Sequence, residues 1–453
     1  MMDAKLIQKY NVPGPRYTSY PTVPYWSTDE FNIEVWKETF KESTTRHRDQ
    51  GISLYIHLPF CEKLCTFCGC IKRITKNHQV EDPYIDTLLK EWHLYLDLLG
   101  FRPKLRELHL GGGTPTFFEP ENLKRLLSEI LSSADSDQIE ISFEGHPNNT
   151  TYDHLRVLYE LGSRRVSFGV QDYDPIVQKA INRIQPFENV EKVHHLSREL
   201  GYNSISHDLV FGLPHQNEAG ITNTIEKTLE LKPDRISFYS YAHVPWIKGI
   251  GQRGFNEDDL PKDAQKRKLY ELGKNMFFDH DYYEIGMDHF ALRTDDMYKA
   301  MVNNVLHRNF MGYTTTDTKV MIGLGMSAIG DTWYSFSQNI KSVEEYSAKV
   351  HDGQFPIFRG HLLNSEDLIV RQHILNLMCH FYTSWEDKDL QFKELPECLT
   401  RLEEMEKDGL IIIGKNDLTV PEKSRPFIRN VCMAFDMHLI RNKPSTKTFS
   451  MTI

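Results

Sequence analysis

Four of the seven cysteines in this 453-residue chain lie within ten positions, in the segment PFCEKLCTFCGC at residues 59–70. They are Cys61, Cys65, Cys68 and Cys70. Closely spaced thiols bind metal ions or iron–sulfur clusters, and a CxxC pair can also carry disulfide redox chemistry. This loop is therefore the first candidate for chemistry, and the elements around it must hold the thiols in place.

The spacing of the thiols separates these alternatives. Structural zinc generally takes two pairs of ligands from separate segments, and the sequence has no second CxxC. A thioredoxin-type pair would use Cys65 and Cys68 but would leave Cys61 and Cys70 without a role. Inert buried cysteines rarely gather in one short loop that also contains proline and glycine. An iron–sulfur cluster fits best, because thiolates from one loop can bind one face of a cubane.

Composition limits the partners and the location. The chain has 53 basic and 63 acidic residues, a net charge of -10, so we expect no nucleic-acid partner. The longest apolar run, residues 320–330, is short and broken by glycine, so we expect no membrane insertion. Cys379, Cys398 and Cys432 lie far from the loop and make a poor disulfide framework, and the N-terminus lacks the apolar stretch of a signal peptide. We therefore expect a reducing, cytoplasmic location.

Short apolar strands alternate with helical stretches from residue 52 to residue 245. The predicted strands are residues 52–58, 105–111, 139–145, 165–171, 205–212 and 235–242. Between them lie amphipathic stretches such as residues 122–134 and 221–232. This alternation predicts an α/β fold with a parallel sheet. Because no Rossmann fingerprint is present, we expect a partial TIM-like (β/α)6 barrel rather than a doubly wound sheet.

Polar residues gather where these strands end. The cysteine loop follows the first strand and GGGTPT, residues 111–116, follows the second. Glu144, Gln171 and Asp208 lie near the ends of the next three strands, and the last strand ends at residues 241–243. Carboxyl ends of barrel strands meet on one face, so one active site is expected there. The glycines can let the backbone and its exposed amides approach a ligand, or they can simply make a tight turn.

The flanking regions suggest two additions to a catalytic domain at residues 46–360. Residues 1–45 contain the Pro- and Tyr-rich GPRYTSYPT, and we expect this N-terminal arm to fold over the site. Residues 361–453 predict a mostly helical, winged-helix-like cap, with helices at residues 365–381, 396–409 and 424–435 and a hairpin at residues 410–420. A structural cap is favoured over a DNA reader, because residues 394–408 hold six acids and two bases.

The CxxxCxxC spacing resembles the motif of the radical S-adenosylmethionine (SAM) superfamily, with Phe67 at a position that is commonly aromatic. The resemblance implies that Cys61, Cys65 and Cys68 hold a [4Fe-4S] cluster. It also implies that the amino and carboxylate groups of SAM chelate the fourth iron. One electron from the cluster then cleaves SAM to methionine and a 5′-deoxyadenosyl radical.

The longer pattern CxxxCxxCxC followed by Lys72 resembles the family of oxygen-independent coproporphyrinogen III oxidases (dehydrogenases) of haem biosynthesis. Other stretches resemble that family from one end of the chain to the other. They include GPRYTSYPT (14–22), LHLGGGTPT (108–116), DLVFGLP (208–214), IGMDHFA (285–291), VLHRNFMGYTT (305–315), GLGMSAIG (323–330) and IRNVCMAFD (428–436).

The resemblance assigns the remaining site residues. Those expected to contact the chelated SAM are Tyr55, Gly112, Glu144 and Ile329. A second SAM is expected to lie among Phe67, Gly113, Thr114, Gln171, Arg183, Asp208 and Ala242. Cys70 is not a cluster ligand in the family, so the four thiols divide into three plus one. Tyr55 and Cys70 are the candidates for a catalytic role.

The implied reaction converts two propionates of coproporphyrinogen III to vinyl groups and releases two CO2, with one SAM consumed for each. A substrate with four carboxylates needs cations. The candidates are Arg16, Lys72, Arg308, Arg425 and Arg429, and for each a solvated surface charge is the alternative. The resemblance also implies an electron donor such as flavodoxin or ferredoxin, and we expect a monomer.

Two features depart from the family's pattern. EGHP at residues 144–147 replaces the usual E-x-[DN]-P, and His207 stands beside Asp208. Two other functions on the same fold also stay open: a haem chaperone, and a radical SAM methyltransferase that opens the haem ring. Chaperones of this fold typically lack the residue at Cys70 and the GPRYTSYPT arm, both of which are present here.

Overall fold

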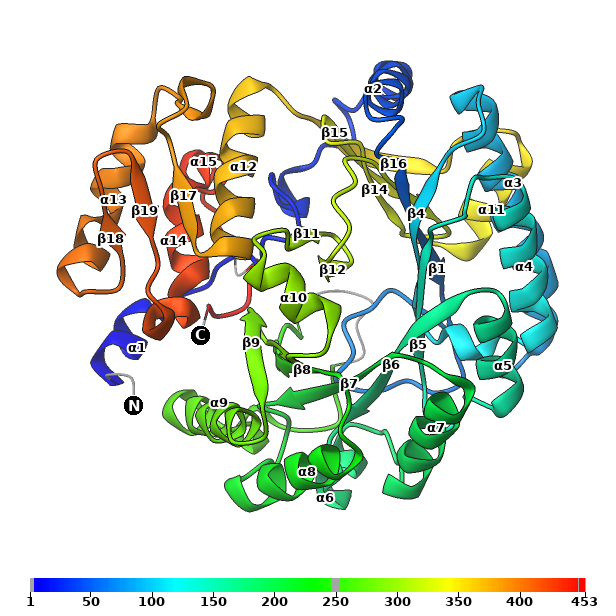
Figure 1. Cartoon of the computed structure of the whole chain (residues 1–453), viewed down its shortest axis with the longest axis horizontal. Helices are drawn as coiled ribbons and strands as arrows, with labels where there is room; N and C mark the ends of the chain where they lie inside the picture. Colours follow the sequence, from blue (N-terminus) through cyan, green and yellow to red (C-terminus); the bar gives the residue numbers. More distant parts are fainter. Residues whose placement is uncertain (1–3, 246–251, 447, 453) are drawn as a thin grey trace.

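The parallel strands form the middle of one curved sheet in the computed structural model, which describes residues 4–245, 252–446 and 448–452 (Figure 1). The six predicted strands are β1 (Ile52–Leu58), β4 (Leu105–Gly112), β5 (Glu140–Gly145), β6 (Ser163–Gln171), β7 (Ser204–Phe211) and β8 (Arg235–Ser240). They lie side by side in this order and pair in parallel. Each predicted boundary is within two residues of the observed one, and the partial (β/α)6 barrel is confirmed.

Helices cover the outer face of the parallel strands (Figure 1). They are α3 (Glu81–Leu99), α4 (Pro120–Ser132), α5 (Tyr152–Glu160), α6 (Pro175–Ala180), α7 (Phe187–Leu200), α8 (Glu218–Leu231) and α9 (Asp263–Phe278). In α4, Leu123, Leu126, Leu127 and Ile130 are buried. Their spacing of three, one and three residues forms the apolar stripe that packs the helix against the sheet.

Successive side chains along each strand point to opposite faces of the sheet, so that one face forms the packed core and the other faces the site. In β1, Leu54 and Ile56 pack under the helices, whereas Ser53, Tyr55 and His57 alternate with them. Ser53 Oγ donates a hydrogen bond of 3.0 Å to Glu107 on β4, so the alternate positions turn polar side chains into the barrel. The register also sets neighbours, because Glu144 of β5 lies opposite Ser167 of β6.

The sheet continues past both ends of the six predicted strands. On the β1 side it adds β13 (Met321–Leu324), β14 (Ile329–Asp331), β15 (Ser335–Asn339) and β16 (Ile357–Leu362). On the β8 side it adds β10 (His289–Leu292) and β9 (Tyr282–Gly286). The sequence pattern does not predict these strands, because most are three to five residues long and lack a regular apolar alternation.

The C-terminal region has the predicted order of helix, helix, hairpin and helix. Its elements are α12 (Ser365–His380), β17 (Tyr382–Ser384), α13 (Leu395–Lys407), β18 (Ile412–Ile413), β19 (Asp417–Thr419), α14 (Ile428–Phe435) and α15 (Met437–Arg441). The short strands form a separate sheet in the order β17-β19-β18. The apolar cluster of this region includes Tyr17 and Tyr20 from the N-terminal arm. The arm therefore packs against the C-terminal region as well as the barrel.

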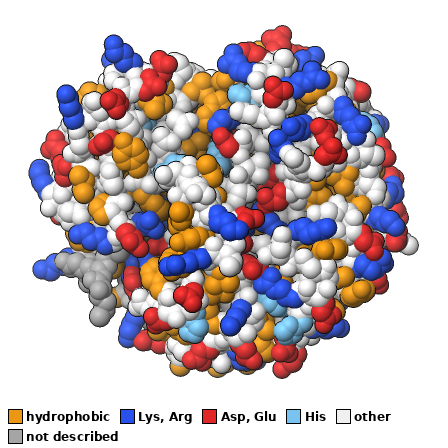
Figure 2. Space-filling model, viewed as in Figure 1, with side chains coloured by type: hydrophobic (Ala, Val, Ile, Leu, Met, Phe, Trp, Pro, Cys, Tyr) orange, Lys and Arg blue, Asp and Glu red, His pale blue; other side chains and the backbone are white. Residues whose placement is uncertain are grey.

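The surface of this face of the molecule mixes acidic and basic side chains without segregating them (Figure 2). Among the described helices, none combines the length and the apolar content that a bilayer crossing requires.

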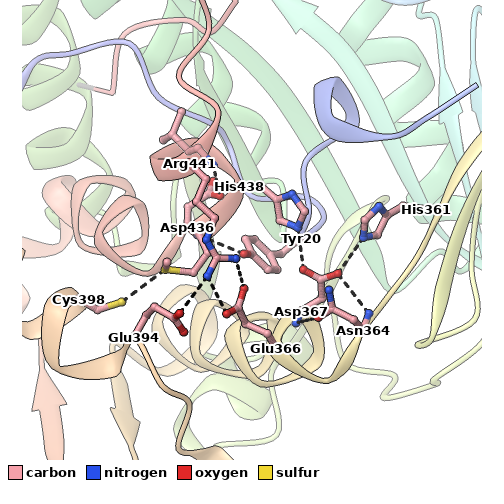
Figure 3. Close-up of polar contacts among 12 residues, drawn as sticks. Tyr20, His361, Asn364, Glu366, Asp367, Glu394, Cys398, Asp436, His438 and Arg441 are labelled. Carbon is pink, nitrogen blue, oxygen red and sulfur yellow. Dashed lines mark hydrogen bonds and ion pairs between the residues drawn. The ribbon is translucent and has the colours of Figure 1, made fainter. Parts of the chain in front are cut away.

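A buried carboxylate fastens the C-terminal region to the sheet (Figure 3). Asp367 at the start of α12 is fully buried and contacts the Nε2 atoms of His361 on β16 at 2.9 Å and His438 on α15 at 2.7 Å. Burial alone would raise the pKa of Asp367, but the two histidines together hold it well below its usual range. The adjacent elements β16 and α12 therefore meet α15, which is distant in sequence, at one carboxylate.

We expect Asp367→Asn to destabilise the fold. The neutral amide cannot accept hydrogen bonds from both imidazoles as the charged carboxylate does. The free energy of unfolding should fall by about 1.5–3 kcal/mol at pH 7. Circular dichroism should show this loss as a lower melting temperature. Since the folded pKa lies below the ordinary value of 3.8, the carboxylate's contribution is complete at neutral pH and is lost as pH falls below that value.

The matched control is Glu366→Gln on the same helix. Glu366 pairs with Arg441 at the surface, where side-chain exposure is 23% and 47% respectively. Such pairs contribute about 0–1 kcal/mol. Equal melting temperatures for the Asp367 and Glu366 variants would contradict the proposed clamp.

Candidate functional site

The cysteine loop leaves β1 at the carboxyl mouth of the barrel and is held there by backbone contacts. Cys61 lies on the two-residue strand β2 (Phe60–Cys61), which pairs in parallel with β3 (Arg73–Ile74). Thr66 donates its backbone N–H to Ile181 O at 2.9 Å, and Asn182 Nδ2 donates to Leu64 O at 2.7 Å. The end of α6 therefore fixes the middle of the loop beside strands β6 and β7.

Each of the three predicted cluster ligands has a hydrogen-bond donor near its sulfur. Thr114 Oγ1 lies 3.3 Å from Cys61 Sγ, and Arg183 Nη1 lies 3.8 Å from Cys65 Sγ. A hydrogen bond from the Cys70 thiol is the main cause that lowers the pKa of Cys68 to about 6, and the positive charge of Lys72 contributes. Burial raises the pKa of Cys61 to about 11. Donors that stabilise thiolates are what a metal-binding trio requires.

These residues fit an iron–sulfur cluster better than a single metal ion. Among the described residues, the cysteines do not form a group whose ligand atoms all lie within 4.8 Å of one another. One ion needs such convergence, whereas the thiolates of a cubane bind three separate irons. The trio also leaves one iron for a non-protein ligand. Cys70 belongs to the site through its electrostatic interaction with Cys68, which lowers the pKa of Cys68 and raises that of Cys70.

The glycines after β4 are required by close backbone packing. A Cβ on Gly112, whose φ is 112°, would lie 2.7 Å from the His57 ring, and one on Gly113 would lie 2.5 Å from Pro59 O. The Gly113 N–H donates to Leu58 O at 2.8 Å, and the Thr114 N–H donates to Phe60 O at 3.0 Å. The N–H groups of Gly113 and Thr114 are therefore already engaged by the carbonyls of Leu58 and Phe60.

Tyr55 and Glu144 lie together on the inner face of the barrel, beside His109. The Tyr55 ring stacks on His109 at a centroid distance of 6.2 Å, and its hydroxyl lies 3.0 Å from His57 Nδ1. Glu144 Oε1 lies 3.5 Å from His109 Nε2. Burial would raise the pKa of Glu144, but His109 and the Gly112 N–H lower it overall. Glu144 is thus held as an anion with its side chain 48% exposed.

Gln171, Arg183 and Asp208 are brought to the next part of the mouth. Arg183 Nη2 donates to Gly169 O at 2.6 Å, and a Cβ on Gly169 would collide with the side chains of both Gln171 and Arg183. Asp208 accepts from Ser167 Oγ at 2.7 Å. Burial raises the pKa of Asp208 to about 6, and the nearby Glu144 charge adds to this rise. The predicted second cofactor position therefore combines a guanidinium with a readily protonated carboxyl.

Phe67 and Ala242 are joined by a residue that the sequence analysis did not select. Gln252 Nε2 donates to Phe67 O at 3.2 Å and to Ala242 O at 2.8 Å. No motif marks Gln252, and only the fold brings it to the cysteine loop. His109 was also missed, although its position in LHLGGG, two residues before the glycines, was a usable signal.

Ile329 is separated from Tyr55 of β1 by the strand β13, whose Gly323 pairs with Tyr55. It begins β14 and packs with Trp26 and Phe336 in a small apolar cluster. Its surroundings are those of a core side chain, which is the ordinary interpretation of an isoleucine.

The two departures from the family's pattern have local explanations. A Cβ on Gly145 would lie 2.8 Å from the Phe168 ring, so glycine fits a crowded position. His146 Nδ1 accepts the Asn148 N–H at 3.2 Å, and burial with the nearby Arg183 charge keeps the pKa of His146 well below its usual value. His207 is fully buried and contacts His194 at 3.2 Å, so it is a neutral packed histidine.

A cavity of about 480 Å³ lies beyond the ends of β7 and β8. Ala242 connects its lining to the predicted second cofactor position, and three of the five predicted substrate cations, Arg16, Arg425 and Arg429, also line it. Residues 450–452 complete its wall. Arm, barrel and C-terminal region thus enclose one ligand-sized space.

Several of the five predicted substrate cations already donate hydrogen bonds to backbone carbonyls. Arg429 is buried and donates to the carbonyls of Gly14, Pro15 and Met451. Arg308 is also buried, and its Nε donates to Tyr17 O at 3.4 Å. Lys72 Nζ lies 3.4 Å from Cys68 O and 3.2 Å from Cys70 O, beside the cysteine loop. Neither Arg308 nor Lys72 lines the cavity, so the structure does not bring the five cations together.

Comparisons with known proteins agree with this geometry. The profile of the radical SAM superfamily matches residues 55–228. The oxygen-independent coproporphyrinogen III oxidase of Pseudomonas aeruginosa is 37% identical over 445 residues, and the alignment covers 96% of each chain. The Escherichia coli K12 protein of the same name is 37% identical over 457 residues, covering 100% of this chain and 98% of its own.

The likeness extends to three dimensions and to both ends of the chain. The solved structure of the coproporphyrinogen III oxidase HemN from Escherichia coli, described as a radical SAM enzyme, superimposes with a TM-score of 0.90. Sequence identity is 34%, and the match covers 97% of this chain and 99% of that one. The chain belongs to the oxygen-independent coproporphyrinogen III oxidase family of the radical SAM superfamily.

Proposed function

We propose that this enzyme converts coproporphyrinogen III to protoporphyrinogen IX in haem biosynthesis. Two propionates are oxidatively decarboxylated to vinyl groups without oxygen. The observation that carries the proposal is the structural likeness over 97% of the chain, at a TM-score of 0.90. Haem chaperoning and ring-opening methylation lack such support among the described features.

The enzyme uses a [4Fe-4S] cluster and two molecules of SAM per turnover. When bound, they supply a carbon-centred radical that removes hydrogen from a propionate side chain. Cys61, Cys65 and Cys68 hold the cluster in this proposal, and Cys70 tunes it through Cys68. The loop contacts from Asn182 and the close packing at the end of β4 keep the thiols fixed.

The barrel's inward side chains position the organic cofactor. We assign Tyr55, Gly112 and Glu144 to the SAM at the cluster, where the Glu144 carboxylate can accept from hydroxyl or amino groups. The second SAM would lie among Phe67, Gly113, Thr114, Gln171, Arg183, Asp208 and Ala242. The assignment of Ile329 rests on the family resemblance alone.

The cavity is proposed as the substrate site. Arg16 and Arg425 line it and are the best candidates to bind propionates. Arg425 Nη1 has a long contact of 3.4 Å with Glu284 O, so a carboxylate can replace it as the better acceptor. Arg308 and Arg429 instead anchor the arm, and Lys72 anchors the cysteine loop.

Several coarser features complete the proposal. We divide the chain into an arm at residues 1–45 that covers the site, a catalytic barrel at residues 46–360 and a cap at residues 361–453. We propose a monomer that takes electrons from flavodoxin or ferredoxin. A reducing, cytoplasmic location suits the free thiols of the loop.

The decisive experiment is an anaerobic assay of the reconstituted protein with coproporphyrinogen III, SAM and a reductant. We expect protoporphyrinogen IX and two CO2 for each substrate, with two methionines formed. Tight haem binding without turnover would support the chaperone and refute this function. A methylated open tetrapyrrole would support the methyltransferase.

Separate substitutions should distinguish the ligand cysteines from Cys70. We expect Cys65→Ala to lose the broad visible absorbance and most of the iron, because only two cluster thiolates remain. Cys70→Ala should keep the iron, because it removes a hydrogen-bond donor and no ligand. The iron content of each variant after anaerobic reconstitution measures both outcomes. Full iron content in the Cys65 variant, or its loss in the Cys70 variant, would refute the division of three plus one.

Arg183→Ala should weaken SAM binding by about tenfold or more while most of the cluster stays, because a charge-assisted hydrogen bond is lost. The Arg183 Nε is buried and has no hydrogen-bond partner among the described residues, which leaves it available to a ligand. Anaerobic titration with SAM measures the change. Arg198→Ala, which removes a surface pair with Asp234, is the control. Unchanged affinity in the Arg183 variant would remove this residue from the site.

A further inference from the structure

The cavity contains a carboxylate that binding of a tetra-anionic substrate does not explain. Four acidic residues line the cavity: Glu257, Asp258, Glu284 and Asp288. The side chains of Glu257 and Asp258 are at least 81% exposed. Glu284 is buried but has strong partners, Lys274 at 2.7 Å and Tyr270 at 3.0 Å. Asp288 alone of these four is both largely shielded from solvent, with its side chain 14% exposed, and weakly paired.

The backbone fixes the position of Asp288. It lies in the turn between β9 and β10 with a φ of 63° and accepts the Phe238 N–H through its carbonyl at 2.7 Å. Few residues other than glycine adopt this conformation, although Asp and Asn tolerate it best. The turn therefore presents the carboxylate at a fixed place beside the end of β8.

The Asp288 side chain has unused acceptor capacity. Its side-chain partner is Arg16 Nη1 at 3.4 Å, which is longer than an ordinary N–H···O hydrogen bond. Arg16 Nη2 donates instead to Ser240 O at 3.1 Å. The Asp288 side chain is 14% exposed, and burial raises its pKa despite the nearby Arg16, Arg429 and Arg308. A carboxylate that is buried but underused is costly unless a ligand supplies donors.

The proposed substrate has such donors. Coproporphyrinogen is a ring of four pyrroles, with carboxylates at its rim and four N–H groups directed towards its centre. Cations suit the rim, but only an acceptor suits the centre. One carboxylate offers two oxygens and can accept from more than one N–H.

We infer that Asp288 accepts hydrogen bonds from the central pyrrole N–H groups of the tetrapyrrole, while Arg16 and Arg425 bind its propionates. This inference rests on the proposed function and adds a residue that selects the reduced macrocycle. Asp288 is a binding residue that orients the ring, and no proton transfer is assigned to it.

The test compares two ligands on two variants under anaerobic conditions, by titration of the full chain. The ligands are coproporphyrinogen III and palladium(II) coproporphyrin III, which has the same carboxylates, no N–H and no affinity for axial ligands. Asp288→Asn keeps the turn conformation and should weaken binding of coproporphyrinogen by about tenfold or more. Binding of the palladium compound should be unchanged or tighter.

The control is Asp281→Asn, which replaces an exposed aspartate at a φ of 65° in the turn before β9. It should alter neither affinity. Iron content serves as the check that each variant is intact. If the Asp288→Asn protein does not retain its iron, the same two ligands are compared on Asp288→Ser. Equal losses of affinity for both ligands, or no loss for either, would overturn the inference. The proposed function would still be supported if the wild-type protein converts coproporphyrinogen III. Failure of the wild type to convert coproporphyrinogen would refute the function itself.

Discussion

The close approach of two strand ends governs the rest of the site. β1 and β4 leave so little room at the carboxyl mouth that Gly112 and Gly113 cannot carry a side chain. Their contact aligns the start of the cysteine loop with the residues that follow β4, and it brings Thr114 to Cys61. A methyl group at either glycine would force the loop away from the barrel. The thiols would then be separated from the residues that serve their cofactor.

Inside the barrel, polar groups compensate for burial by pairing with one another. Glu144 stays anionic because His109 faces it, whereas burial and the nearby Glu144 charge raise the pKa of Asp208. Two carboxyl groups with different protonation behaviour therefore stand in one mouth. This difference arises from neighbours on adjacent strands, which the parallel register brings together.

Much of this arrangement was predictable from the sequence. The six central strands are apolar runs bounded by glycine, proline or polar residues, and the cysteine spacing admits few alternatives. The short strands β13 to β15 gave no comparable signal. The roles of Arg308 and Arg429 were not predictable either, because a guanidinium can serve a ligand or cap carbonyls, and only tertiary placement decides which. Asp288 and Gln252 likewise depend on contacts between segments that are distant in sequence.

Arg429 has a consequence for the order of assembly. Its guanidinium holds Gly14 and Met451 at once, and its bond to Gly14 spans 415 residues. During synthesis the barrel strands can pair while the chain is still growing. The wall that encloses the ligand space, however, needs residues 450–452. A nascent chain can therefore fold its barrel long before it can retain a substrate, because the cavity is enclosed only after residues 450–452 have been added.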